Sequence, residues 1–261
     1  MSKTTTSPVV LVTGASRGIG AATALAFGRA GWRVAITARG SLDTTAQAMQ
    51  QITGVQVFAH TMDLMDKASL DHALDAVLAH YGRIDLLINN AVYQDREMNA
   101  LLLDLEDTML ERTLQGNVVA PFHLTRRLLP WMLKQGGGQI INICSGAGQY
   151  DPPLPADQGG WGFAYGASKA GLIRLAGCID RELGKQGLRA YSVNPGVVTT
   201  EAVIATLGDG SLLAQRYGAV MPETIAQSLL WLATDPAAPA YARGKGMLEL
   251  QQIAREQGFA L

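Results

Sequence analysis

Short apolar runs rich in β-branched residues alternate along this chain with longer segments of helical composition. The run "VVLVT" at 9–13 is typical of a buried strand, because it is short and β-branched and glycine follows it. The next segment, "IGAATALAFGRAG" at 19–31, has helical composition and ends on Gly31, a common helix stop. Strands that alternate with helices form parallel sheets covered on both faces. The pattern therefore predicts an α/β fold with a doubly wound parallel sheet of about seven strands and helices on both faces.

The same alternation continues to the end of the chain. The expected strands are 9–13, 33–38, 55–60, 84–89, 138–145, 188–196 and 245–250. The expected helices are 19–31, 42–51, 67–82, 117–135, 165–187, 200–216 and 222–233, followed by a short helical tail. We find no linker, repeat or low-complexity tract, so we expect one domain over 1–261, with a flexible start at 1–7 and a C-terminal tail at 251–261.

Composition and charge exclude several classes of partner. The net charge of −1 argues against nucleic acid or an anionic membrane as the main partner. The start "MSKTTTSP" lacks the apolar core of a signal peptide, and no apolar run reaches membrane-spanning length, so we expect a cytoplasmic protein. Cys144 and Cys178 lie in apolar segments, which favours buried thiols in a reducing compartment. The four histidines lack metal-site spacing, so no metal is expected.

A glycine-rich loop, "TGASRGIG" at 13–20, lies where the first strand passes into the first helix. Glycine permits a tight turn and close approach of the backbone to a phosphate, which then faces the N-terminus of the helix. The spacing is G-x-x-x-G-x-G, through Gly14, Gly18 and Gly20. Its position between the first strand and the first helix makes a dinucleotide the expected ligand.

The end of the second strand indicates which dinucleotide. An NAD enzyme usually has an acidic residue there that holds the ribose 2′-hydroxyl. Here Ala38 stands at that position and Arg39 follows, while Arg17 lies inside the glycine loop. Two arginines without a carboxylate suit a 2′-phosphate, so NADP(H) is preferred and NAD(H) is possible. The alternative is that both arginines are simply solvated surface residues.

Tyr165 and Lys169 stand four residues apart in "FAYGASKAG" at 163–171, which reads as the start of a helix. Residues at this spacing lie on one face of a helix. A neighbouring ammonium favours the phenolate form of the tyrosine, which would let it exchange a proton near neutral pH. The alternative is a surface lysine beside a half-buried tyrosine, and the pair alone does not decide between them.

Several motifs in a fixed order strengthen the catalytic interpretation. They are "TGASRGIG" at 13–20, "NNA" at 89–91, "NVVAPFHLT" at 117–125, Ser145, "YGASK" at 165–169 and "NPG" at 194–196. The chain resembles the short-chain dehydrogenase/reductase family in these motifs, from about Val9 to Leu250. The resemblance implies a Rossmann-type fold that forms one dinucleotide-binding and catalytic domain.

The resemblance also implies roles for individual residues. Tyr165 would be the general acid in ketone reduction and the base in the reverse direction, and Lys169 would assist it and bind the nicotinamide ribose. Ser145 would hydrogen-bond the substrate oxygen, and Asn117 would position a water that links Lys169 to solvent. The implied cofactor-binding residues are Gly14, Ser16, Arg17, Gly18, Ile19, Gly20, Arg39, Asp63, Leu64, Asn90, Ala91, Tyr165, Lys169, Pro195, Gly196, Val198 and Thr200.

The chain departs from the family pattern at three places. Val92 replaces the glycine that usually follows "NNA", and it is expected to narrow the substrate pocket. The segment between Ser145 and Tyr165 is longer than usual, and Tyr150 and Trp161 make it a candidate wall or lid. A loop whose aromatic residues cover the protein's own core is the alternative. The tail after Leu250 would cover the pocket or reach a neighbouring subunit.

We therefore expect an NADP(H)-dependent oxidoreductase, a carbonyl reductase that interconverts a ketone or aldehyde and its alcohol on a largely apolar small molecule. A 3-oxoacyl reductase acting on carrier-protein or CoA substrates is an alternative. A non-catalytic NADP-sensing regulator and a methyltransferase on a similar sheet are alternatives from other classes, but they leave Tyr165 and Lys169 without a role. The resemblance also implies a homodimer or homotetramer formed through the two long helices.

Overall fold

The computed structural model describes residues 7–54, 57–201, 203–204 and 218–260. Seven parallel strands form one sheet in the order β3-β2-β1-β4-β5-β6-β7, which confirms the predicted fold. The strands are β1 (Val9–Thr13), β2 (Arg33–Ala38), β3 (Phe58–Thr61), β4 (Leu86–Asn89), β5 (Gly138–Ile143), β6 (Leu188–Asn194) and β7 (Leu248–Glu249).

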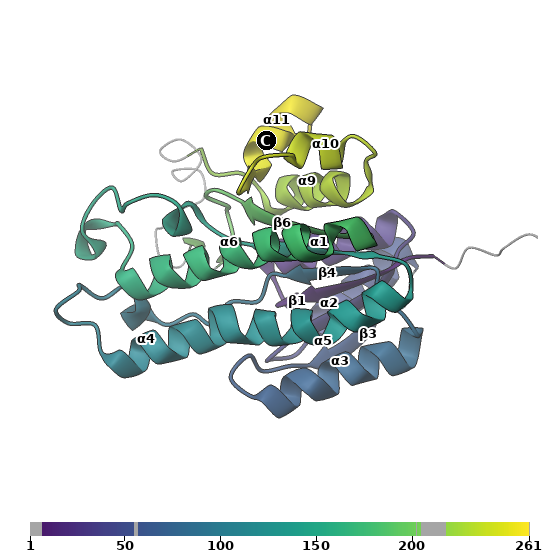
Figure 1. Cartoon of the computed structure of the whole chain (residues 1–261), viewed down its shortest axis with the longest axis horizontal. Coiled ribbons are helices and arrows are strands. Elements are labelled where there is room, and N and C mark those ends of the chain that lie inside the picture. The colour runs from purple at the N-terminus through teal and green to yellow at the C-terminus, as the bar shows by residue number, and fades with distance from the viewer. Residues whose placement is uncertain (1–6, 55–56, 202, 205–217, 261) are drawn as a thin grey trace, which may run out of the picture.

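Helices cover both faces of this sheet, and in Figure 1 α5 and α6 lie on the near side of the strands. The helices of one face are α1 (Gly18–Arg29), α2 (Asp43–Thr53), α9 (Pro222–Thr234), α10 (Ala238–Ala242) and α11 (Leu250–Gln257). The helices of the other are α3 (Lys67–Tyr81), α4 (Asp107–Leu114), α5 (Ala120–Lys134) and α6 (Phe163–Leu183). The described part of the chain also contains short helical turns: η1 (Arg96–Asn99), η2 (Gln115–Val119), η3 (Gly146–Gly148), η4 (Ala156–Gln158) and η5 (Gly184–Gln186).

The central strands are mostly apolar because both of their faces are covered. In β1, Val10 and Val12 pack in the core on the α1 side, whereas Val9 and Leu11 pack in the core on the α3 side. This follows from the alternation of side chains along a strand. Because the sheet is buried on both faces, the ends of its strands are fixed in position. The loops that follow these strands therefore also begin at fixed positions.

The strand order reverses at β1, which pairs with β2 on one side and with β4 on the other. Doubly wound sheets bind ligands in the crevice outside the carboxyl ends of the strands at such a switch point. The glycine loop follows β1 and Asn90 follows β4, so both lie at this crevice.

Several element boundaries differ from those expected. The long helix begins at Asp107 rather than 117, through α4 and the π-helical turn η2, because the polar segment "DTMLERTL" is amphipathic and buries only Met109 and Thr113. The last strand has two residues rather than six, since α11 begins directly after Glu249. Most of the expected helix at 200–216, and residues 1–6 of the N-terminus, lie outside the described residues.

One cysteine prediction is wrong. Cys144 is buried, as expected, but Cys178 is exposed on the outer face of α6. Cys178 lines the apolar groove between α5 and α6. Its apolar neighbours in the sequence, such as Leu175, line the same groove, so an apolar segment did not mean a buried thiol here. Within the described part of the chain, no helix is both long and apolar enough to cross a bilayer.

Candidate active site

The glycine loop has a backbone that other residues would not allow. Gly14 and Gly18 adopt φ values of +67° and +56°, in the left-handed region that favours glycine. A Cβ added at Gly14 would lie 2.7 Å from the Cα of Ala91, and one at Gly20 would collide with the carbonyl of Gly14. The loop therefore packs tightly on itself and on the turn after β4.

Two side chains hold this loop from opposite sides. Asn90 Nδ2 donates to the carbonyl oxygens of Thr13 at 2.8 Å and Gly14 at 3.0 Å. Thr45 on α2 is buried, and its Oγ1 donates to the carbonyl oxygens of Ala15 at 3.0 Å and Ser16 at 3.2 Å. Sequence reasoning identified Asn90 but missed Thr45, because nothing in the sequence distinguishes it from its neighbour Thr44.

The N-terminus of α1 fits an anionic group. Arg17 precedes the helix in an extended conformation, and no side chain caps the first turn. The first backbone N–H groups of a helix lack intrahelical partners, and they carry the positive end of its dipole. Arg17 and Arg39 are both exposed, and neither side chain has an ion pair or hydrogen bond to the described part of the chain. Their guanidinium groups remain available to a phosphate, so the residues present fit a phosphorylated dinucleotide.

Ser145 and Tyr165 are brought to the same edge of the sheet from different elements. Ser145 directly follows the short Cys144 link after β5, and its Oγ accepts a hydrogen bond from the N–H of Ala147 at 3.2 Å. Tyr165 lies half-buried in the first turn of α6. The intervening loop carries Tyr150 back against Gly146 and Trp161 against Gly166, so both aromatic rings lie beside the two candidate catalytic residues.

Lys169 lies below Tyr165 on the same face of α6. Its ammonium group is 5.8 Å from the centroid of the Tyr165 ring and donates to the carbonyl oxygen of Ile143 at 3.0 Å. Lys169 is only 6% exposed, so its ammonium group lies inside the protein and not in bulk solvent. This geometry excludes the alternative of a surface lysine. The ammonium group is buried and bonded to the carbonyl oxygen of Ile143, so it stays close to Tyr165.

Asn117 lies in η2, a π-helical turn that opens the helix between α4 and α5. Its Oδ1 accepts from the N–H of Tyr93 at 2.7 Å, and its Nδ2 lies 3.4 Å from Ser168 Oγ on α6. Single π-helical turns of this kind inside α-helices occur frequently at functional sites. The asparagine thereby links the loop after Ala91 to the helix that carries Tyr165.

The remaining predicted cofactor residues line the crevice from the other side. Pro195 is buried and Gly196 is exposed with φ +68°, directly after β6. Further along this loop, Thr200 approaches the glycine loop, since a Cβ added at Gly18 would lie 3.2 Å from Thr200 Cγ2. The other residues of this group are Ile19 at the start of α1, Asp63 and Leu64 after β3, Ala91 after β4 and Val198, which pairs with Val220.

The loop between Ser145 and Tyr165 is anchored. Its last residue before α6, Gly162, donates through its N–H to Asn99 Oδ1 at 2.9 Å, and so joins it to the 92–103 loop. Val92, Tyr150 and Phe163 on these two loops expose apolar surface, as do Leu101, Leu102 and Leu103, which sequence reasoning did not single out. The same loops also expose charged side chains, among them Arg96, Glu97 and Asp151.

Comparison with known proteins agrees with this geometry. The family model for short chain dehydrogenase matches residues 8–208. The chain is 35% identical to a 3-oxoacyl-[acyl-carrier-protein] reductase from Synechocystis, covering 92% of this chain and 94% of that protein. It is 30% identical to a Thermotoga maritima protein of the same name, covering 91% and 94%.

Solved structures give the same result. L-sorbose reductase from Gluconobacter frateurii, complexed with NADPH and L-sorbose, superposes with a TM-score of 0.80 at 25% identity, covering 94% of each chain. Actinorhodin polyketide ketoreductase with NADPH superposes with a TM-score of 0.78 at 28% identity, covering 93% of this chain and 95% of that one. The chain belongs to the short-chain dehydrogenase/reductase family, and it is a nicotinamide-dependent oxidoreductase that interconverts carbonyl groups and alcohols.

Proposed function

We propose that this enzyme reduces a ketone or aldehyde with NADPH, and that Tyr165, Ser145, Lys169 and Asn117 are its catalytic residues. The observation that carries the proposal is the buried ammonium of Lys169 beneath the ring of Tyr165, at the sheet edge that also carries Ser145. When bound, the dinucleotide supplies the hydride that this chemistry requires.

The protein's side chains then manage charge and protons at the carbonyl oxygen. Ser145 and Tyr165 donate hydrogen bonds to this oxygen, where negative charge grows during reduction. The Tyr165 hydroxyl gives its proton to the oxygen, and the nearby Lys169 charge stabilises the phenolate that remains. Asn117 fixes the loop after Ala91 through Tyr93, and links it to α6 through Ser168. In the reverse direction the Tyr165 phenolate accepts the proton of the alcohol.

The preference for NADP(H) rests on Arg17 and Arg39. Both guanidinium groups are exposed and uncommitted to any described side chain, at the end of β2 and in the glycine loop. A 2′-phosphate would accept hydrogen bonds from both, whereas a 2′-hydroxyl would use neither charge. The cofactor residues lining the rest of the crevice are those named from the sequence.

For the substrate we favour a largely apolar small molecule. Val92, Tyr150 and Trp161 are the proposed pocket residues, and the exposed leucines at 101–103 extend the apolar surface of the 92–103 loop. The loop at 146–163 carries Asp151 and Asp157 and no lysine or arginine, which disfavours an acidic carrier protein. The second candidate is a 3-oxoacyl thioester, favoured by the names of the relatives that are 35% and 30% identical.

We also propose that the enzyme is a homodimer or homotetramer through the outer face of α5 and α6. Phe122 and Trp131 on α5 are about half exposed, and Val118, Phe122 and Cys178 line an apolar groove between the two helices. Exposed contiguous apolar surface of this kind usually marks an interface.

The first test measures oxidation of NADPH against a panel of ketones, aldehydes and 3-oxoacyl thioesters. Tyr165→Phe removes only the hydroxyl, so we expect kcat to fall by about 10²–10⁴-fold. Tyr241→Phe is the matched control, because Tyr241 lies on α10 and its hydroxyl bonds to Glu256 on α11. Equal turnover by Tyr165→Phe and wild type would refute the assignment, and the best substrates would decide between free ketones and thioesters.

The second test concerns the cofactor. Arg39→Ala should raise KM for NADPH by roughly tenfold and leave KM for NADH nearly unchanged, since a charge-assisted bond to the phosphate is lost. Arg29→Ala is the control, because Arg29 is an exposed arginine at the far end of α1. Equal effects of Arg39→Ala on both cofactors would refute the role of this residue in selecting the phosphate.

A further inference from the structure

The loop 195–200, which follows β6, connects two parts of the site. It begins beyond Asn194, the last paired residue of β6, and it ends where Thr200 approaches Gly18. Its far half is held by Val220, which pairs with Val198 and accepts a hydrogen bond from the N–H of Thr199 at 2.9 Å. Val220 also donates its N–H to the carbonyl oxygen of Val197 at 3.1 Å. The near half, Pro195 and Gly196, takes part in no strand pairing among the described residues, so other groups define its position.

Gln251, in the first turn of α11, holds the near half directly. Its Nε2 donates to the carbonyl oxygens of Pro195 at 3.2 Å and Val197 at 3.0 Å, and so uses both hydrogens of the amide. The same side chain fills the space over Gly196, where an added Cβ would lie 2.5 Å from Nε2. The loop is therefore fixed at the residue before Gly196 and at the residue after it.

Glu249, the last residue of β7, holds the same loop through Asn194. Its Oε2 accepts from Asn194 Nδ2 at 2.8 Å, and Asn194 Oδ1 accepts from the N–H of Gly196 at 3.0 Å. A carboxylate only accepts hydrogen bonds, so it turns the amide nitrogen of Asn194 toward itself and the amide oxygen toward Gly196. Partial burial raises the pKa of Glu249, and the Asn194 hydrogen bond opposes that rise.

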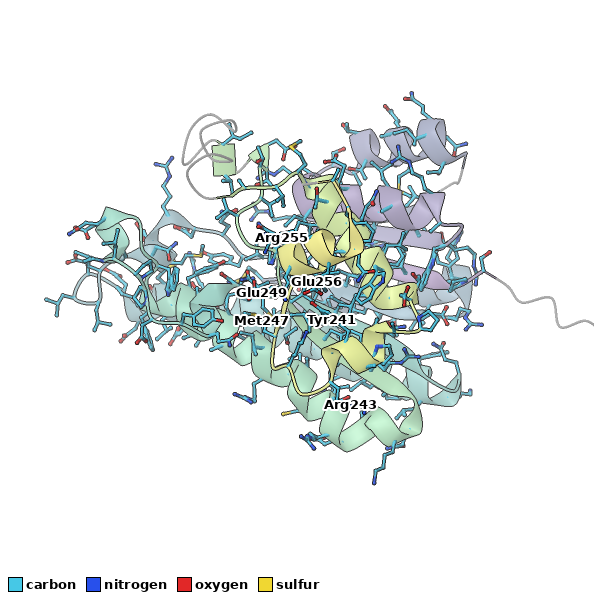
Figure 2. The ribbon with its side chains drawn as sticks, turned by 90° about the horizontal axis from the view of Figure 1, so that it is seen from above. Tyr241, Arg243, Met247, Glu249, Arg255 and Glu256 are labelled. Carbon is cyan, nitrogen blue, oxygen red and sulfur yellow. The ribbon has the colours of Figure 1, made fainter. Side chains whose placement is uncertain are left out.

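The segment that carries these two side chains, the end of β7 and the start of α11, is itself firmly held. Leu250, Ile253 and Ala254 of α11 are fully buried, and Ser228 Oγ on α9 donates to the carbonyl oxygen of Leu250 at 3.0 Å. Figure 2 shows Glu249 and Met247 on the part of the C-terminal segment that faces α6. Because α11 is packed into the core, its hydrogen bonds hold the 195–200 loop at a fixed position relative to the core.

We propose that Gln251 and Glu249 are positioning residues that fix the 195–200 loop and so set the width of the crevice at the nicotinamide end of the cofactor. The proposal rests on the proposed function in one respect, namely that this loop faces the nicotinamide. The C-terminal segment thus acts on the site from behind the loop, without touching the reacting atoms.

Two measurements on the full-length chain test this. The first is hydrogen exchange of peptides covering 195–200 in the protein without added cofactor. Gln251→Leu removes both donors at similar volume, and we expect exchange at Gly196 to become about tenfold faster. Gln252→Leu is the matched control, because Gln252 is exposed on the same helix and bonds only to Glu256 among the described residues.

The second measurement compares two ligands by calorimetry. NADP⁺ reaches the whole crevice, whereas adenosine 2′,5′-bisphosphate carries no nicotinamide. We expect Gln251→Leu to weaken NADP⁺ by at least about fivefold and to leave the bisphosphate unchanged. A purely structural role would weaken both ligands equally.

Unchanged exchange in Gln251→Leu, or equal weakening of both ligands, would overturn the proposal. Faster exchange in a protein whose wild type binds neither ligand would support the positioning of the loop while refuting the proposed cofactor. If Gln251→Leu does not fold, Glu249→Leu tests the same idea, since it frees Asn194 and should speed exchange at Gly196.

Discussion

Thr45 offers a sharp test of how the glycine loop is held. Its buried hydroxyl donates to the carbonyl oxygens of Ala15 and Ser16, and the hydrogen bond to Ala15 lies in a buried environment. Thr45→Val replaces the hydroxyl with a methyl group of the same shape, so the change removes the hydrogen bonds and little else. The buried carbonyl of Ala15 would then lose its donor.

The expected cost is about 1–2 kcal/mol of unfolding free energy, from one shared hydrogen bond and one buried acceptor left unpaired. For a chain of this size, that corresponds to a fall in Tm of about 2–8 °C. If cofactor binding must restore the loop, the same free energy weakens NADP⁺ by about 5–30-fold. Thermal melts and calorimetry check the two values separately.

Thr44→Val is the control for this experiment. Thr44 is the preceding residue on α2 and is exposed, so the same chemical change there should leave both Tm and NADP⁺ affinity near wild type. If Thr45→Val melts with Thr44→Val and binds NADP⁺ equally well, the reasoning about the loop is wrong. A fall in Tm without loss of affinity would show that Thr45 stabilises the fold but does not shape the site.

Two further predictions concern the helices around the site. A Cβ added at Gly116 would collide with Tyr93, so Gly116→Ala should displace the loop that Asn117 holds and cost about 1–3 kcal/mol, measured by urea unfolding; wild-type stability would refute the clash. Hydrogen bonds from His123 and Arg127 lower the pKa of Asp71 to about 2, so its stabilising effect is complete above about pH 4 and is lost as the pH falls toward 2. Asp71→Asn should flatten the fall in Tm over that range, and an unchanged acid profile would contradict the assignment.

The fold was predictable because its strands are buried on both faces. A strand such as β1, all five residues of which are buried, is apolar except for its last residue, Thr13, and this pattern is visible in the sequence. Boundaries set by packing were less accessible. The helix that begins at Asp107 has a polar outer surface, and β7 is short because α11 follows it at once.

The candidate site divides in the same way. The sequence by itself determined the glycines of the loop, the arginines near the expected 2′-phosphate and the spacing of Tyr165 and Lys169, because these features depend on local backbone freedom and on neighbours within one helical turn. Only the tertiary structure distinguished Thr45 from Thr44 and Gln251 from Gln252, which are pairs of identical adjacent residues. Thr45 meets a carbonyl 30 residues away, and Gln251 meets one 54 residues away. Such contacts depend on how α2 and α11 pack against the sheet, and no local pattern in the chain encodes which of two like neighbours faces inward.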